Sequence, residues 1–184
     1  MEADSTGDVL KPFLFDLKTK NIKKLPIKNQ PLFNLEIAPE GNRIAFLSYQ
    51  ADKSGAGDYR IGIYDIVKES STILNGVKAS RNTVFSWHPN GRQLIYNSKE
   101  GMIKSVNVVD AKVTSMFRGE APAWSPDGNR LAYRSGSEIR IYDSINKSTV
   151  KVYKRNLLQS SMLGRLYWSP DARYISFNVA SGLD

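Results

Sequence analysis

The chain has 184 residues, a formal net charge of +8 and no cysteine. Its length supports a sizeable hydrophobic core, and its content of 41% apolar and 24% charged residues is typical of a globular protein. The absence of cysteine excludes disulfides and thiolate metal sites, and no apolar run reaches the roughly 18 residues of a membrane-spanning helix. The positive charge suits anionic partners. The lysines are scattered through turns rather than gathered in one patch, as is typical of lysines that keep exposed strand edges from pairing with other chains. We therefore do not expect nucleic-acid binding.

One ten-residue pattern occurs four times along the chain and predicts the same tight turn between two short strands. In the third copy, residues 124–133, an apolar strand ends at a tryptophan, Ser-Pro-Asp-Gly turns the chain, and Leu-Ala-Tyr begins the next strand. The other copies cover residues 37–46, 87–96 and 168–177. The turn prolines are Pro39, Pro89, Pro126 and Pro170, spaced by 50, 37 and 44 residues. These spacings bracket the roughly 40–45 residues of a four-stranded propeller blade.

A second repeat lies between successive turns and predicts two further strands. A short strand rich in β-branched and aromatic residues ends at an aspartate, and a polar turn then leads to a fourth strand. The third strands cover residues 13–16, 61–65, 105–110 and 139–143, with terminal aspartates Asp16, Asp65, Asp110 and Asp143. The sequence therefore predicts an all-β fold built from a repeated unit of four antiparallel strands.

In order, the repeats predict three complete blades of a β-propeller and two half-blades within one domain. The complete blades are expected at residues 35–75, 84–118 and 122–154, and the half-blades at 10–30 and 165–180. Three closures remain open. The termini could share a blade in a four-bladed ring, a second copy could complete a larger ring, or the chain could be part of a longer propeller.

The Trp-Ser-Pro-Asp-Gly-x-x-Leu-Ala-Tyr pattern resembles the repeat of TolB-like propellers, distant relatives of WD repeats. Ala38 and Glu40 in the first copy, His88 and Asn90 in the second and Ala172 in the fourth depart from it. The resemblance implies a non-catalytic scaffold for protein–protein interaction in the bacterial cell envelope, in the periplasm. Residues 1–8 lack the features of a signal peptide, so the cytoplasm is the alternative. The repeat also resembles the propellers of prolyl-oligopeptidase-like peptidases, which gives a second interpretation: a gating propeller whose catalytic domain lies elsewhere.

The residues that could perform chemistry are few, and we predict no enzyme, no cofactor and no metal site. His88 is the only histidine and occupies a turn, and no Gly-x-Ser-x-Gly nucleophile elbow is present. Aspartates at strand ends are expected to accept backbone hydrogen bonds within their own turns. The recurring Trp87, Trp124 and Trp168 are expected to pack between neighbouring blades, with an aromatic platform for sugars as the alternative.

The irregular loops on one face, expected at residues 25–34, 50–58, 75–83, 118–121 and 154–165 and called the loop face below, are the remaining candidate for function. Loop variation on a rigid scaffold is where binding resides. These loops are basic, and we predict that they bind a protein partner with an acidic or polar surface. The predicted binding residues are Lys78, Arg81, Arg118, Arg155 and Arg165. Homo-oligomerisation that completes the propeller is a further expectation.

Overall fold

A computed structural model describes residues 12–27, 32–51, 53, 57–154 and 165–178. Over these ranges the chain consists of strands and turns, which confirms the all-β prediction. None of the described residues forms a helix long and apolar enough to cross a membrane.

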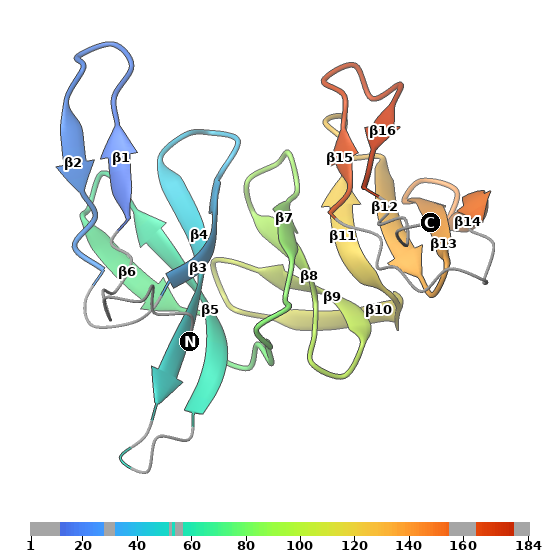
Figure 1. Ribbon diagram of the computed structural model, residues 1–184, viewed down its shortest axis with the longest axis horizontal. Coiled ribbons are helices and arrows are strands. Elements are labelled where there is room, and N and C mark those ends of the chain that lie inside the picture. The colour runs from blue at the N-terminus through green and yellow to red at the C-terminus, as the bar shows by residue number, and fades with distance from the viewer. Residues whose placement is uncertain (1–11, 28–31, 52, 54–56, 155–164, 179–184) are drawn as a thin grey trace, which may run out of the picture.

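Three four-stranded antiparallel sheets form the body of the molecule and follow one another in chain order across Figure 1. Each is a meander in which consecutive strands are hydrogen-bonded neighbours. The first sheet contains β3 (Leu32–Ile37), β4 (Arg43–Ala51), β5 (Gly57–Asp65) and β6 (Ser70–Ile73). The second contains β7 (Phe85–Trp87), β8 (Gln93–Asn97), β9 (Met102–Asn107) and β10 (Val113–Arg118). The third contains β11 (Glu120–Trp124), β12 (Arg130–Ser135), β13 (Glu138–Asp143) and β14 (Ser148–Lys154). The predicted four-stranded antiparallel sheets are thereby confirmed.

Two short hairpins flank these sheets at opposite ends of the molecule. One is β1 (Phe13–Phe15) with β2 (Ile22–Lys24), and the other is β15 (Tyr167–Trp168) with β16 (Ile175–Ser176). Figure 1 shows the first, in blue, beside the first sheet and the second, in red, beside β11 and β12 of the third sheet, with the second sheet between them. They form separate two-stranded sheets, so the described residues do not make a four-bladed ring in which the termini share a blade. Each hairpin instead packs on the face of its neighbouring sheet.

The turns form for the local reasons that the sequence suggested. In the turn after β11, the Ser125 hydroxyl accepts a hydrogen bond from the Arg130 amide at 3.0 Å, and Gly128 has φ +71°. Ala172 takes the matching position after β15 with φ +56°, which costs an alanine more than a glycine. After β5 and β13, the carboxylates of Asp65 and Asp143 accept amide hydrogen bonds two and three residues ahead.

The second sheet differs from this pattern at its third strand. The sequence predicted that this strand ends at Asp110, but β9 ends at Asn107. The Asn107 side chain accepts the Val109 amide at 2.9 Å, while Asp110 lies within the turn and accepts the Lys112 amide at 2.9 Å. An asparagine can cap this turn as an aspartate does, so the strand ends three residues earlier than the aspartate pattern indicated.

The core lies between the stacked faces of the sheets. Ala45, Leu47 and Ile61 of the first sheet pack with Phe85 and Leu94 of the second. Further clusters join the second sheet to the third and each terminal hairpin to its neighbouring sheet. This stacking sets the first strands β3, β7, β11 and β15 along one side of the row, where they line a common surface.

Candidate functional site

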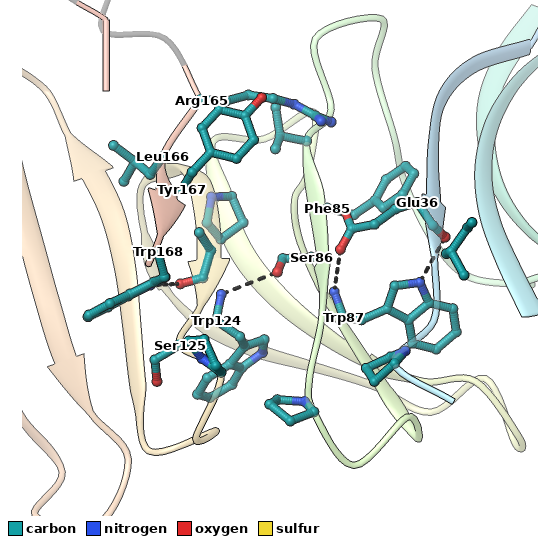
Figure 2. A pocket seen from close by; sticks show the side chains of 17 residues that line it. Glu36, Phe85, Ser86, Trp87, Trp124, Ser125, Arg165, Leu166, Tyr167 and Trp168 are labelled. Atoms are coloured by element: carbon teal, nitrogen blue, oxygen red, sulfur yellow. Dashed lines mark hydrogen bonds between the residues drawn. The ribbon is translucent and has the colours of Figure 1, made fainter. Parts of the chain in front are cut away.

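The first strands of the sheets line a pocket with a volume of about 540 Å³ (Figure 2). Its walls include side chains from β3, β7, β11 and β15, and three of the four turn prolines, Pro39, Pro89 and Pro126, lie along it. Pro170, in the last turn, is exposed. Lining from four separate strands makes this pocket a product of the sheet stacking.

The three repeated tryptophans connect each first strand to the preceding one. The Trp87 indole N–H donates to the carbonyl oxygen of Glu36 at 3.1 Å, and the Trp168 indole N–H donates to that of Ala123 at 2.9 Å. The Trp124 amide donates to the Ser86 hydroxyl at 3.2 Å. Trp87 is buried, and the other two indoles are partly buried. The structure thus places all three at the boundaries between successive sheets.

An arginine on the second strand covers the next tryptophan at two of these boundaries. The Arg43 guanidinium lies 5.4 Å from the Trp87 ring centroid and donates to the Gly91 carbonyl at 2.6 Å. Arg130 repeats both contacts, at 5.0 Å from the Trp168 ring and 2.8 Å from the Ala172 carbonyl. Each arginine combines a cation–π contact with a charge-assisted hydrogen bond to the neighbouring turn.

The middle boundary uses different residues for the same purpose. Gln93 stands where the other sheets have arginine, and the His88 ring contacts Trp124 edge-on at 4.7 Å between centroids and 76° between planes. The His88 Nδ1 atom accepts the Asn90 amide at 3.1 Å, which leaves the proton of a neutral ring on Nε2. His88 lies in the turn where the sequence put it. Its ring packs between two sheets, which the sequence alone did not reveal.

Two opposite charges face the pocket. Burial raises the pKa of the Glu36 carboxyl, while the Trp87 amide and the positive charge of Arg165 act in the opposite direction. The Trp87 amide donates to Glu36 Oε1 at 3.0 Å. Figure 2 labels both charged residues among the lining residues: Glu36 lies on β3, and Arg165 lies just before β15. This pairing suits a polar ligand segment better than a purely apolar one.

A second cavity of about 470 Å³ opens on the face that carries the irregular loops. Arg165 and Val84 line both this cavity and the first-strand pocket, so the two adjoin. Lys99 and Arg134 also line the second cavity, together with Glu120, which forms an ion pair with Arg134. Arg165 is therefore the predicted binding residue that the structure places most centrally.

The other predicted binding residues lie more peripherally. Lys78 lines a third cavity of about 300 Å³ with Lys99 and lies 3.9 Å from Glu100. Arg81 and Arg118 are exposed on the loop face, and Arg155 lies outside the described residues. Sequence reasoning missed Lys99 and Arg134, which lie in or beside the short turns between second and third strands. Counting those turns as part of the loop face would have found Lys99, whereas Arg134 lies within β12.

The described residues contain no group of three or more histidine, aspartate or glutamate side chains arranged to hold a metal ion. The strand-end aspartates are engaged in their own turns, as described above. What the site offers is a surface of cations, amides and indole rings, suited to binding.

Comparisons with known proteins place the fold but no family. No family model matches the chain, and no curated protein matches it. Among solved structures, 634 chains are similar. One belongs to a structure described as "Crystal Structure of Mitotic Checkpoint Complex", with a TM-score of 0.61 and 14% sequence identity. The match covers 91% of this chain and 52% of that one, so this chain spans about half the length of its neighbour. At this identity the likeness concerns the fold alone, and it is consistent with a WD-like β-propeller.

Proposed function

We propose that this chain is a non-catalytic propeller scaffold that binds a protein partner through its loop face. The observation that carries the proposal is the position of Arg165, which lines two adjoining cavities beside Lys99 and Arg134. Its partner segment would cross the loop face at Arg165 and continue along the first strands.

The charges of the loop face favour an acidic segment. Lys78, Arg81, Lys99 and Arg118 are exposed there. The nearby acids Glu100 and Glu120 already form ion pairs with lysine and arginine side chains, which reduces their repulsion of an incoming carboxylate. Arginine is suited to this role because its planar guanidinium binds carboxylates through two parallel hydrogen bonds.

A charge-reversal experiment tests the loop face. The variant Arg81→Glu/Arg118→Glu/Arg165→Glu is compared with the unmodified chain for binding of a fluorescent Asp/Glu-rich peptide and for cross-linking to proteins in the native host. We expect at least a tenfold loss of peptide affinity, roughly the 1.4 kcal/mol that the loss of one good charged contact would account for.

The matched control applies the same change in charge to the opposite face. Lys18→Glu/Lys112→Glu/Lys147→Glu alters three exposed residues in the turns between third and fourth strands. The affinity of this control for the peptide should fall far less than that of the loop-face variant. Circular dichroism should show that both variants are folded. Equal loss in the two variants would mean that net charge alone, and not the loop face, determines binding.

The resemblance of the repeats supports a more specific role as a TolB-like scaffold in the cell envelope, with the cytoplasm as the alternative location. Fractionation of the native host, with detection by an antibody to this chain, distinguishes the two compartments. The same repeats also support a gating propeller of a prolyl-oligopeptidase-like peptidase. A Gly-x-Ser-x-Gly domain encoded beside this segment would favour the peptidase, whereas further propeller repeats would favour the scaffold.

A further inference from the structure

Large apolar side chains are exposed at the two ends of the row of sheets. Among the exposed large apolar residues of the described ranges, four lie in or next to the turns between third and fourth strands: Leu17, Val67, Val109 and Ile145. The rest of the exposed large apolar residues in the described ranges are Phe13, Phe15, Ile22, Leu35, Ile37, Val150, Val152, Tyr167 and Tyr174. All nine belong to the terminal hairpins and the sheets next to them, so the exposed apolar surface marks the ends of the row.

The repeat shows what is missing at the β1–β2 end. Alignment of the strand-end aspartates places Phe15 at the position of Tyr64. Tyr64 is 1% exposed in a complete sheet, whereas Phe15 is 49% exposed. The hairpin β1–β2 corresponds to the third and fourth strands of a blade, and its first and second strands are absent from the sheet it forms.

The sheet beneath this hairpin is covered only in part. Leu14 faces the first sheet and packs with the cluster that contains Ile44, Phe46 and Tyr64. Leu35 and Ile37 are the cross-strand partners of Phe46 and Ile44 and therefore lie on the same face. They remain 47% and 55% exposed. The covered part lies under a third and fourth strand, and the open part would lie under a first and second.

The β15–β16 end of the row has the opposite half of a blade exposed. Trp168 and Ile175 of β15–β16 pack on the third sheet with Ala132 and Ile139, while Tyr167 and Tyr174 are exposed. Val150 shares the face of Ala132 through Ile141, and it stays 56% exposed beyond the hairpin. Here a first and second strand are present, and the open part would lie under a third and fourth.

We propose that β16 of one copy of this chain pairs antiparallel with β1 of a second copy, so that the two hairpins make one four-stranded blade. The complete sheets set the register. Arg43 pairs with Asp65 and Arg130 with Asp143, and the equivalent residues are Tyr174 and Asp16. Ile175 then lies opposite Phe15, and Ser176 opposite Leu14.

The alternation of side chains agrees with this register on both faces. Ile175 already packs on the third sheet of its own copy, and Phe15 of the second copy would join it on that face, over Val150. Leu14 already packs on the first sheet of its own copy, and Tyr174 and Ser176 would join it on that face, near Ile37. The composite blade continues, without interruption, the sheet-to-sheet interface seen within the chain.

Two such junctions close two copies into one ring. Each copy supplies three complete sheets and two hairpins, and the two composite blades bring the ring to eight, at the upper end of the roughly four to eight blades usual for propellers. The same patch pair is used twice, as two-fold symmetry requires.

Cysteine cross-linking tests the register, because the chain has no cysteine of its own. A Phe15→Cys chain is mixed with a larger, tagged Ile175→Cys chain under mild oxidation. We expect a disulfide-linked species containing one chain of each kind. The control mixes Phe15→Cys with Tyr174→Cys, which is exposed but lies on the opposite face in the proposed register, and should cross-link much less.

Solution mass provides the second measurement. Sedimentation equilibrium of the unmodified chain should give twice its 20.6 kDa mass. Phe13→Glu/Phe15→Glu/Ile22→Glu should give a folded monomer, whereas Val67→Glu/Val109→Glu/Ile145→Glu, in exposed turns away from the proposed junction, should remain a dimer. A monomeric unmodified chain, an open series of oligomers, or equal cross-linking in both mixtures would overturn the proposal. The first result would also fit edges that are covered by other segments of a longer protein.

Discussion

The first and second sheet boundaries join similar sheets with different side chains. Between the first and second sheets, Arg43 covers Trp87 and holds the Gly91 carbonyl, and Glu36 accepts two hydrogen bonds from Trp87. Between the second and third sheets, Gln93 replaces the arginine, and His88 contacts Trp124 instead. A repeat can thus lose a boundary residue at one copy and regain the ring contact from the adjacent turn.

Each boundary keeps its tryptophan, whereas the side chain that packs on the indole ring differs: Arg43 at Trp87 and His88 at Trp124. Trp87 is almost fully buried, while Trp124 keeps part of its surface open. The first boundary should therefore depend more strongly on its tryptophan than the second.

Trp87→Ala should give the largest effect. Removing a buried indole leaves a cavity, the Glu36 carbonyl loses the indole N–H donor, and the Arg43 guanidinium loses its ring contact. We expect a loss of about 3–5 kcal/mol in the free energy of unfolding, measured by urea denaturation. Trp124→Ala, with a partly exposed indole, should cost about half as much. An equal cost at both positions would show that the two boundaries do not differ as described.

Arg43→Gln converts the cover of the first boundary into that of the second. The variant loses the cation–π contact and the hydrogen bond to Gly91, without a histidine to replace them. We expect a loss of about 1–2 kcal/mol by urea denaturation. Arg92→Gln removes an exposed arginine nearby and serves as the control, with an expected change below about 0.5 kcal/mol.

The sequence predicted the parts of the fold that local chemistry determines. The Ser-Pro-Asp-Gly turns and the strand-end aspartates form through hydrogen bonds and backbone preferences of residues close in sequence. The antiparallel four-stranded sheets could therefore be predicted from the sequence. The end of β9 could not, because Asn107 caps its turn without the expected aspartate.

The boundary contacts required the structure, because each joins residues about 40 to 50 positions apart. The sequence identified the tryptophans and His88, but not which neighbour each ring meets. The same limit applies to the loop face: Arg165 was predicted, whereas its meeting with Lys99 and Arg134 depends on how the sheets stack.

Tyr96→Phe tests a repeat position at which the first and second sheets carry different residues. Tyr96 in the second sheet and Phe46 in the first occupy the same repeat position, and both are buried. The Tyr96 hydroxyl has no hydrogen-bond partner among the described residues, and burial raises the pKa of this tyrosine to about 12. Because a buried hydroxyl without a partner is costly, we expect the variant to be more stable by about 1 kcal/mol in urea denaturation. A loss of stability would mean that the hydroxyl does have a partner in solution.

Glu36→Gln should give the smallest effect at neutral pH and a distinctive pH dependence. Burial raises the pKa of Glu36 in the folded state above its unfolded value, so the ionised form disfavours folding. As the pH falls from neutral through the folded pKa, protonation of Glu36 should stabilise the wild-type chain, and this gain is complete below the unfolded pKa of about 4.3. Glutamine keeps an oxygen for the Trp87 amide but cannot titrate. The variant should therefore be as stable as wild type or slightly more so at pH 7, and should lose this advantage towards pH 4 in thermal melts.

Glu100→Gln is the matched control for this measurement, since its pH dependence has the opposite sign. The Ser98 hydroxyl, followed by Lys104, lowers the pKa of Glu100 to about 2. Ionised Glu100 favours the folded state above its unfolded pKa, and that contribution is lost as the pH falls through the folded value. Wild type should exceed Glu100→Gln slightly at pH 7 and approach it in acid. If both variants followed the wild-type profile in parallel, neither carboxylate would contribute to the pH dependence, and the buried charge at the first boundary would have no energetic consequence.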